Sequence, residues 1–147
     1  MMNLKNGIPV NIFLKTVINQ KEGNEEFLYE ITGQVARVGH NLYVRYEEPQ
    51  PDGVSFSPVT IKIYPDQSVQ LIRTTAEARV RLHFQYQETT ETIYKTPYGS
   101  MFFHVYTQDL QISLTDHPMA GKVRVNYELL MQDEKIGTYE VYLKFTA

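Results

Sequence analysis

The sequence predicts an all-β fold: a single antiparallel meander β-barrel of about 8–10 strands. Apolar and polar side chains alternate with a period of two from Val10 to Phe145, and almost no stretch has a helical period. The alternating segments are joined by short links, which leave no room for crossover helices and make neighbouring strands antiparallel. So many strands must close or fold over to bury their apolar faces and edges. A sandwich would also do this, but long meandering strands favour a barrel.

The expected strands follow from this alternation. Each carries apolar side chains at every second position, and polar turn residues separate it from the next. In chain order the expected strands are 10–18, 27–35, 42–47, 59–63, 69–73, 78–87, 93–95, 101–106, 109–115, 123–131 and 139–145.

Proline and glycine mark the clearest breaks between strands. The segment 48–53 contains two prolines and an Asp-Gly pair, which is a strong loop signal. Pro58 indicates an edge position, a bulge or the start of a strand, because proline has no N–H for a ladder. The segment Thr96-Pro97-Tyr98-Gly99 predicts a turn, since Pro fixes φ and Gly permits a positive φ.

Size and composition restrict the possible classes of protein. The 147 residues fit one β-barrel domain, 1–147, which is long enough to bury a core without staples. The absence of Cys excludes disulfides and thiolate chemistry, and the N-terminus shows no signal peptide. No run approaches the ~18 apolar residues of a membrane helix. We expect a cytoplasmic protein without a membrane partner. The net charge of −3 and pI of about 5.8 argue against nucleic acid as a partner.

Three stretches resemble a known family: Tyr94-Lys-Thr-Pro-Tyr-Gly99, Val69-Gln-Leu-Ile-Arg73 and Val123-Arg-Val-Asn-Tyr-Glu-Leu129. The chain resembles the YwiB-like family of uncharacterised Gram-positive bacterial proteins along nearly its whole length. The resemblance implies a calycin, or lipocalin-like, β-barrel and no established activity. This chain departs from the family pattern at Thr74-Thr75, where a Gly is expected close behind the Arg, so the turn there is expected to differ.

Arg73 is the first candidate site residue, because alternation from Val69 and Leu71 places it on the apolar face. An unpaired inward charge is costly. One interpretation is that Arg73 anchors the acidic head group of a small apolar or amphipathic ligand in the barrel interior, helped by tyrosine hydroxyls. The other is that Arg73 emerges at the rim or pairs with an internal Glu. Glu47 and Glu48 are interpreted as solvated charge beside a turn. The inward tyrosines expected to help are Tyr29, Tyr46, Tyr86 and Tyr127.

A second hypothesis uses the outer face as an interaction module for a protein or nucleic acid. Basic side chains on one strand and aromatic side chains on another resemble a contact or stacking platform. The alternative is a solvated face balanced by Glu88, Glu91 and Glu128. The face consists of Arg79, Arg81, Phe102, His104 and Tyr106, whereas Met101, Phe103 and Val105 are expected to face the interior.

An enzyme ranks third among the three hypotheses, because no recognisable catalytic constellation is present. No nucleophile elbow, phosphate-binding loop or metalloprotease motif occurs. The four histidines do not form a pair with metal-ligand spacing, so we expect no metal site, cofactor or catalytic residue. An uncovered edge strand would allow two copies of the chain to pair, so a homodimer is an open alternative. Barrels of this size are either filled by side chains or hold one small ligand, and both alternatives stay open at this point.

Overall fold

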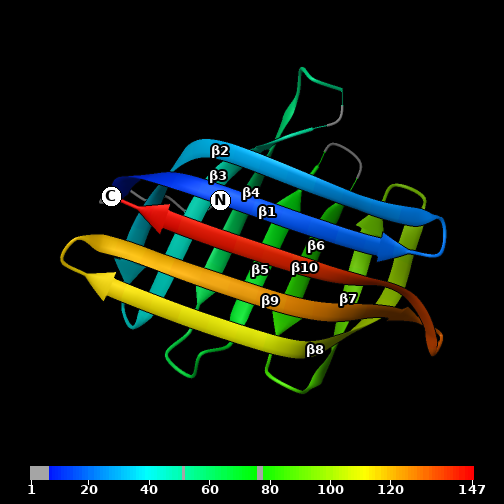
Figure 1. Ribbon diagram of the computed structural model, residues 1–147. Coiled ribbons are helices and arrows are strands. Elements are labelled where there is room, and N and C mark those ends of the chain that lie inside the picture. Colours follow the sequence, from blue (N-terminus) through cyan, green and yellow to red (C-terminus); the bar gives the residue numbers. More distant parts are fainter. Residues whose placement is uncertain (1–6, 51, 76–77) are drawn as a thin grey trace.

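The structure is a computed structural model that describes residues 7–50, 52–75 and 78–147 (Figure 1). The first six residues, within the stretch where no signal peptide is expected, lie outside the described part. The described residues contain no helix long and apolar enough to cross a membrane. The strands are β1 (Ile8–Gln20), β2 (Gly23–Val38), β3 (Asn41–Pro49), β4 (Phe56–Ile63), β5 (Val69–Thr74), β6 (Arg79–Phe84), β7 (Thr89–Thr96), β8 (Gly99–Asp116), β9 (Met119–Met131) and β10 (Glu134–Thr146).

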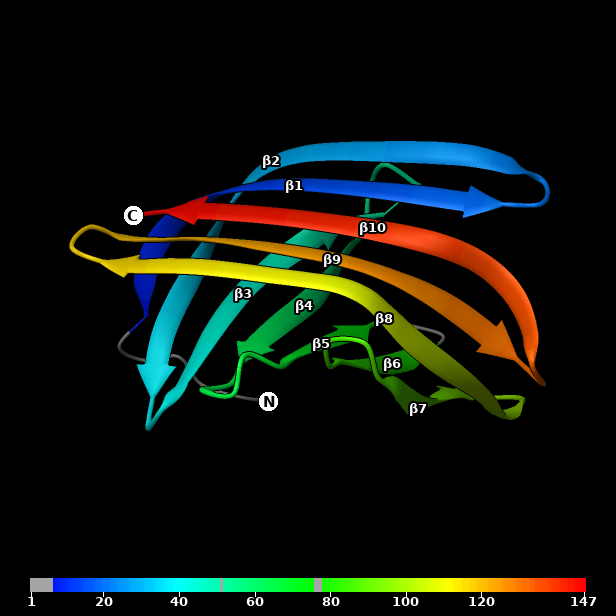
Figure 2. The ribbon, with the colours of Figure 1, turned by 60° about the horizontal axis from the view of Figure 1, so that its bottom comes forward.

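The strands form one closed antiparallel barrel in the order β1-β10-β9-β8-β7-β6-β5-β4-β3-β2. Each strand pairs with its neighbours in sequence, and β1 closes the barrel by pairing with β10. Figures 1 and 2 show a flattened barrel, in which β1, β8, β9 and β10 cross over a second layer that contains β3 to β7. The predicted all-β meander barrel is confirmed.

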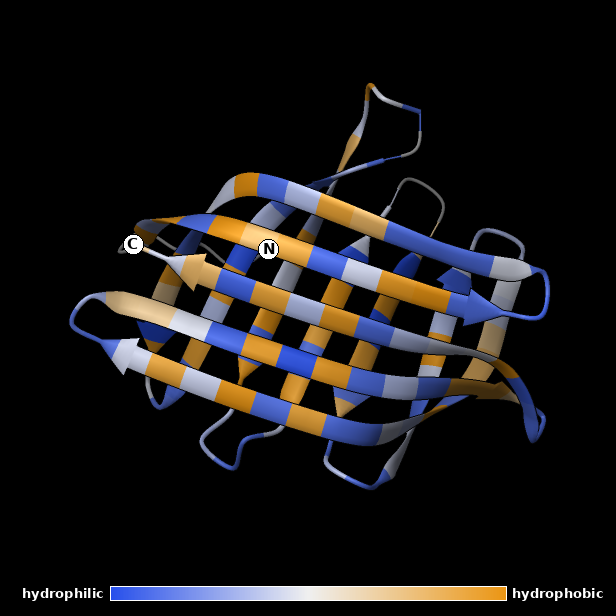
Figure 3. Ribbon diagram, in the orientation of Figure 1, coloured by the Kyte–Doolittle hydropathy of each residue, from blue (hydrophilic) through white to orange (hydrophobic). Residues whose placement is uncertain are grey.

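The core lies between these two layers and follows the period-two pattern. Hydrophobic and hydrophilic residues alternate along β1, β9 and β10 in Figure 3. Val10, Ile12 and Leu14 of β1 are each at most 3% exposed, whereas Asn11 between them points outward. The most completely buried side chains include Phe84, Phe145, Ile12, Leu14, Leu42, Leu143, Val35, Val44, Val59, Val69, Val105 and Val123. These side chains fill the middle of the barrel.

Strand β8 corrects the prediction of separate strands at 101–106 and 109–115. The structure joins them into a single strand, whose register against β9 shifts between Thr107 and Asp109. This bulge adds one residue to β8, and extra residues of this kind bend a strand. Figure 2 shows β8 bending along its length from the layer of β9 and β10 toward β7. Polar Gln108 at the bulge has the appearance of a turn residue in the sequence.

Two side chains expected in the interior are exposed instead. Tyr86 is 55% exposed, because β6 ends at Phe84 and Tyr86 lies in the following turn. Met101 is 43% exposed, because it lies near the tip of the β7–β8 hairpin, opposite Tyr94. In both cases the prediction continued the period-two alternation past the part of the chain that packs against the other layer of the barrel.

The predicted turn at 96–99 is confirmed, with Pro97 and Tyr98 between β7 and β8. Gly99 has a φ of 128°, which strongly favours glycine. The Thr96 hydroxyl donates to the Gly99 carbonyl at 2.8 Å and accepts from the Tyr98 N–H at 3.2 Å. Pro58 lies within β4, opposite Glu47 of β3 and outside the part of β4 that pairs with β5. The missing N–H therefore breaks no bond of the β4–β5 ladder.

Two irregularities of the barrel wall position the sites described below. Strand β2 pairs with β3 only from Gly33 onward, so its first part, Gly23 to Thr32, is bonded to β1 alone. The β1–β2 hairpin therefore overhangs one end of the barrel. In the part of the chain that the structure describes, the seam between β6 and β7 has a single ladder pair, Arg79 opposite Lys95. Threonine hydroxyls bridge the rest of the seam: Thr92 donates to the Arg81 carbonyl at 2.9 Å.

Candidate functional site

Arg73 faces the barrel interior at the end of β5, as alternation predicted. It lies in one cross-strand row with Val59 of β4 and Tyr46 of β3. Its Nη2 atom is 3.0 Å from Oε2 of Glu48, and the two side chains are 33% and 17% exposed. Arg73 therefore pairs with an internal Glu, as one of the two interpretations expected, at a position that water still reaches in part.

Two buried tyrosines lie close enough to this ion pair for its charges to affect their pKa values. Tyr46 is 3% and Tyr127 is 8% exposed. Burial raises the pKa of Tyr46 well above its usual range, and the charge of Glu48 adds to this rise. Burial likewise raises the pKa of Tyr127, and Arg73 only partly opposes the rise. Both phenols are therefore neutral at physiological pH and keep their hydroxyl protons.

Arg73 keeps its charge in spite of partial burial. Burial lowers the pKa of its guanidinium, but the charge of Glu48 and the hydrogen bond to Glu48 raise this pKa above the ordinary value. The five N–H groups of the guanidinium are thus permanent donors.

Two buried polar atoms of this region have no hydrogen-bond partner in the described chain. They are Nε of Arg73 and Oγ1 of Thr107, which lies directly opposite Tyr127 in the β8–β9 ladder. Buried polar groups are normally satisfied, so each exception needs an explanation. We name the set Tyr46, Glu48, Arg73, Thr107, Tyr127 and Tyr139 the barrel-end cluster.

Comparison with known proteins places the chain in a family. Residues 12–143 match a domain of unknown function, DUF1934. The chain belongs to the DUF1934 family. Its fold is similar to the crystal structure of the ywiB protein from Bacillus subtilis, with a TM-score of 0.79 and 17% identity over 97% of this chain and 94% of that one. The expected resemblance to YwiB-like proteins is confirmed. No curated protein matches the chain.

The DUF1934 barrel gathers some of the predicted ligand-binding tyrosines and separates others. Tyr46 and Tyr127 join Arg73 in the barrel-end cluster. Tyr29 lies on the overhanging part of β2, where its ring stacks on Phe27 at 6.4 Å. Tyr86 does not belong to the interior, because it is exposed in a turn. The predicted inward set is thus only partly assembled at one place.

Sequence reasoning missed Glu48 and Tyr139 of this DUF1934 domain. Glu48 was interpreted as solvated, yet alternation continued from inward Tyr46 places Glu48 inward and Glu47 outward, as the structure does. Tyr139 was not among the tyrosines expected to take part in the site, and its ring partner comes from another strand: its ring stacks on that of Tyr127, with centroids 5.0 Å apart. The ring centroid of Phe84 lies 4.8 Å from that of Tyr127, so the three rings form an aromatic wall.

The residues of the predicted interaction face all lie on β6 and β8 of the DUF1934 domain. Arg79 and Arg81 point outward and are exposed. Phe102 is 57% exposed and lies opposite Ile93 of β7, while Nε2 of His104 is 3.9 Å from Oε2 of Glu91. Strand β7 separates the arginines from the aromatic side chains. Tyr106, the remaining member, is half-buried on β8.

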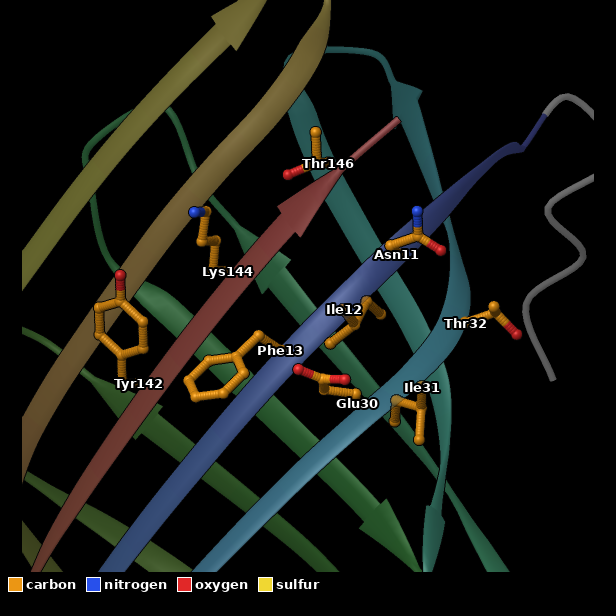
Figure 4. Close-up of a pocket in the computed structure, with 9 residues that line it drawn as sticks. All are labelled: Asn11, Ile12, Phe13, Glu30, Ile31, Thr32, Tyr142, Lys144 and Thr146. Carbon is orange, nitrogen blue, oxygen red and sulfur yellow. The ribbon is translucent and has the colours of Figure 1, made fainter.

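A hollow of about 760 Å³ lies over β10, β1 and β2 (Figure 4). Phe13 and Tyr142 form its aromatic side, with ring centroids 6.2 Å apart and edge to face. Lys144 and Glu30 flank Phe13 in the ladder on either side. The hollow is open and lies on outer strand faces, apart from the barrel-end cluster.

Proposed function

We propose that this DUF1934 domain is a non-catalytic binder of a small apolar or amphipathic molecule with an acidic head group. The observation that carries the proposal is Arg73: a charged guanidinium faces the interior between neutral phenols, and its buried Nε–H has no acceptor in the described chain. The ligand lies at the overhanging end of the barrel, because buried side chains fill the middle.

A carboxylate complements the donors of the barrel-end cluster. Glu48 uses one nitrogen of the guanidinium, which leaves Nε–H for a second acceptor. An ionised carboxylate only accepts hydrogen bonds, so it fits Arg73 together with phenol hydroxyls that remain protonated. Charge-assisted hydrogen bonds of this kind contribute about 1.5–3 kcal/mol each.

The apolar part of the ligand has an aromatic surface beside this head-group position. The ring of Tyr127 contacts those of both Phe84 and Tyr139. The overhang of β2 adds the stacked pair Phe27 and Tyr29, both half-exposed, next to a strand edge that β3 does not cover. Small-molecule sites commonly combine such apolar walls with a few convergent polar groups.

The proposal predicts that substitution of Glu48 raises the affinity for an acidic ligand. A ligand carboxylate on Arg73 brings a second negative charge to a guanidinium that Glu48 already contacts at 3.0 Å. Replacing Glu48 with Gln removes this repulsion and frees the guanidinium, so affinity for an acidic ligand is expected to rise several-fold. Replacing Arg73 with Met removes the attraction, and affinity is expected to fall at least tenfold.

The test begins with native mass spectrometry of the purified protein and continues with calorimetric titration of dodecanoate. We expect a retained ligand mass, saturable binding, tighter binding by Glu48→Gln and weaker binding by Arg73→Met/Glu48→Gln. The double variant is used because it leaves no unpaired charge in the cluster. Arg37→Met is the matched control, since Arg37 pairs with Asp116 at 3.1 Å on the exposed surface.

Two results would overturn the proposal. One is a protein that carries no ligand and shows no saturable dodecanoate binding. The other is binding that the double variant retains in full, because the head group would then lie somewhere other than Arg73.

A further inference from the structure

The outer face of the β3–β6 layer forms a basic hollow that the barrel-end cluster does not use. Its volume is about 660 Å³, within the usual range for small-molecule sites. Of the described residues that line it, four have cationic side chains and none has an acidic one. We name this hollow the basic groove; its charged lining residues are Arg45, Lys62, Arg79 and Arg81.

The strand register distributes these cations around a neutral floor. Arg45, Thr60, Ile72 and Arg81 form one row across four strands, so the two arginine Cα atoms are roughly 14 Å apart at about 4.8 Å per strand. Lys62 lies in the next row, opposite Gln70. Cationic groups therefore reach the same floor from both sides.

Arg79 and Arg81 are the free donors of the basic groove. Among the described residues, neither guanidinium makes a hydrogen bond or an ion pair, and both are exposed. Both also line an adjoining hollow of about 390 Å³ toward β7, to which the described residues Lys95 and Glu91 also contribute. A guanidinium binds phosphate oxygens in a two-pronged fashion that few other side chains match.

Lys62 is held in place by aromatic neighbours. Its Nζ atom lies 4.7 Å from the ring centroid of Tyr64 and 5.4 Å from that of Tyr43. The Tyr64 ring is itself stacked on His83 at 6.0 Å. These contacts order the ammonium group before a ligand arrives, which lowers the entropy cost of binding. They also occupy the ring faces, so the groove offers charge and not a base-stacking platform.

The chain as a whole carries a net charge of −3, so the excess of positive charge in the basic groove is a local feature and does not follow from the overall composition. Acidic side chains gather elsewhere, for example Glu25, Glu26 and Glu30 on the overhanging part of β2. We infer that the basic groove binds a small, multiply phosphorylated molecule. Clustered Arg and Lys around hydroxyl and amide groups fit closely spaced phosphates better than a single carboxylate.

The test uses inorganic tripolyphosphate as the probe, titrated by calorimetry against the full chain. We expect saturable binding with one site, weakened at least tenfold in Arg79→Gln/Arg81→Gln and weakened by raising salt. Lys122→Gln/Lys144→Gln removes the same charge from the outer face of β9 and β10, where the two lysines lie opposite each other, and is expected to leave affinity within twofold. Circular dichroism confirms that each variant is folded.

Three results would overturn this inference. They are no saturable binding, an equal loss in both double variants, or tight binding of a single-stranded oligonucleotide where tripolyphosphate does not bind. The inference is independent of the proposed function, because Arg73→Met/Glu48→Gln leaves the basic groove intact. That variant is expected to bind tripolyphosphate like the wild type, so failure of one site is distinguished from failure of the other.

Discussion

The ion pair between Arg73 and Glu48 allows a quantitative test of how the barrel end is held together. Removing one partner of a fully buried ion pair costs about 3–5 kcal/mol, because the other charge is left unpaired. Here the side chains are 33% and 17% exposed, so water compensates part of this cost. We expect Arg73→Met to lower the free energy of unfolding by about 2 kcal/mol. For a chain of this length that corresponds to a fall in Tm of about 6 °C.

A double-mutant cycle separates the pair from the two individual side chains. Urea unfolding of Arg73→Met, Glu48→Gln and the double variant is expected to give a coupling energy of about 1–2 kcal/mol, since the double variant leaves no unpaired charge. The exposed pair Arg37 and Asp116, at 3.1 Å, is the control, and Arg37→Met/Asp116→Asn is expected to couple by less than about 0.5 kcal/mol. Additive costs at Arg73 and Glu48 would refute the view that their contact organises the barrel end.

Three further predictions concern other parts of the barrel. Because Tyr46 and Tyr127 have folded pKa values above the ordinary 10.0, the free energy of unfolding should be constant below pH 10 and fall above it, by at most roughly 2.7 kcal/mol per pH unit. Urea unfolding between pH 9 and 11 measures this fall, and Tyr46→Phe should halve its slope against pH. Gly33→Ala should destabilise by about 2 kcal/mol or more, since its Cβ would lie 2.5 Å from the Arg45 carbonyl oxygen; an unchanged Tm would contradict this. Thr92→Val should cost about 1.5 kcal/mol and speed amide exchange in β6, since it removes the bond across the β6–β7 seam.

The fold was predictable because alternation alone specifies which side chains face inward. Val10, Ile12 and Leu14 need an apolar face opposite them, and short links allow only antiparallel neighbours to supply it. The bulge in β8 was not predictable, because Gln108 is polar and interrupts the alternation just as a turn residue does. Only the register against β9 shows that the chain continues in the same direction.

The barrel-end cluster was predictable in part. Alternation placed Arg73, Tyr46 and Tyr127 inward, and the structure agrees. The same rule would have placed Glu48 inward, but proximity to a proline-rich loop led to its interpretation as solvent-exposed. The neighbours of Thr107 could not be inferred from the sequence. Thr107 lies opposite Tyr127 only because the bulge shifts the register of β8 against β9 by one residue.

The layer that contains β3 to β6 carries the basic groove on its outer face and Tyr46, Glu48 and Arg73 of the barrel-end cluster on its inner face. The alternation of side chains along each strand decides to which of the two sites a residue of this layer belongs. Adjacent residues on β3 illustrate this: Arg45 lines the basic groove, while Tyr46 belongs to the barrel-end cluster. Because successive side chains of a strand point to opposite faces, a slip of one residue in register would exchange the two sets. Inward Val59 and Leu71 oppose such a slip, since it would expose them to water. The packing that stabilises the barrel therefore also keeps the Arg73–Glu48 ion pair with its neutral phenols inside and the cationic side chains of the basic groove outside.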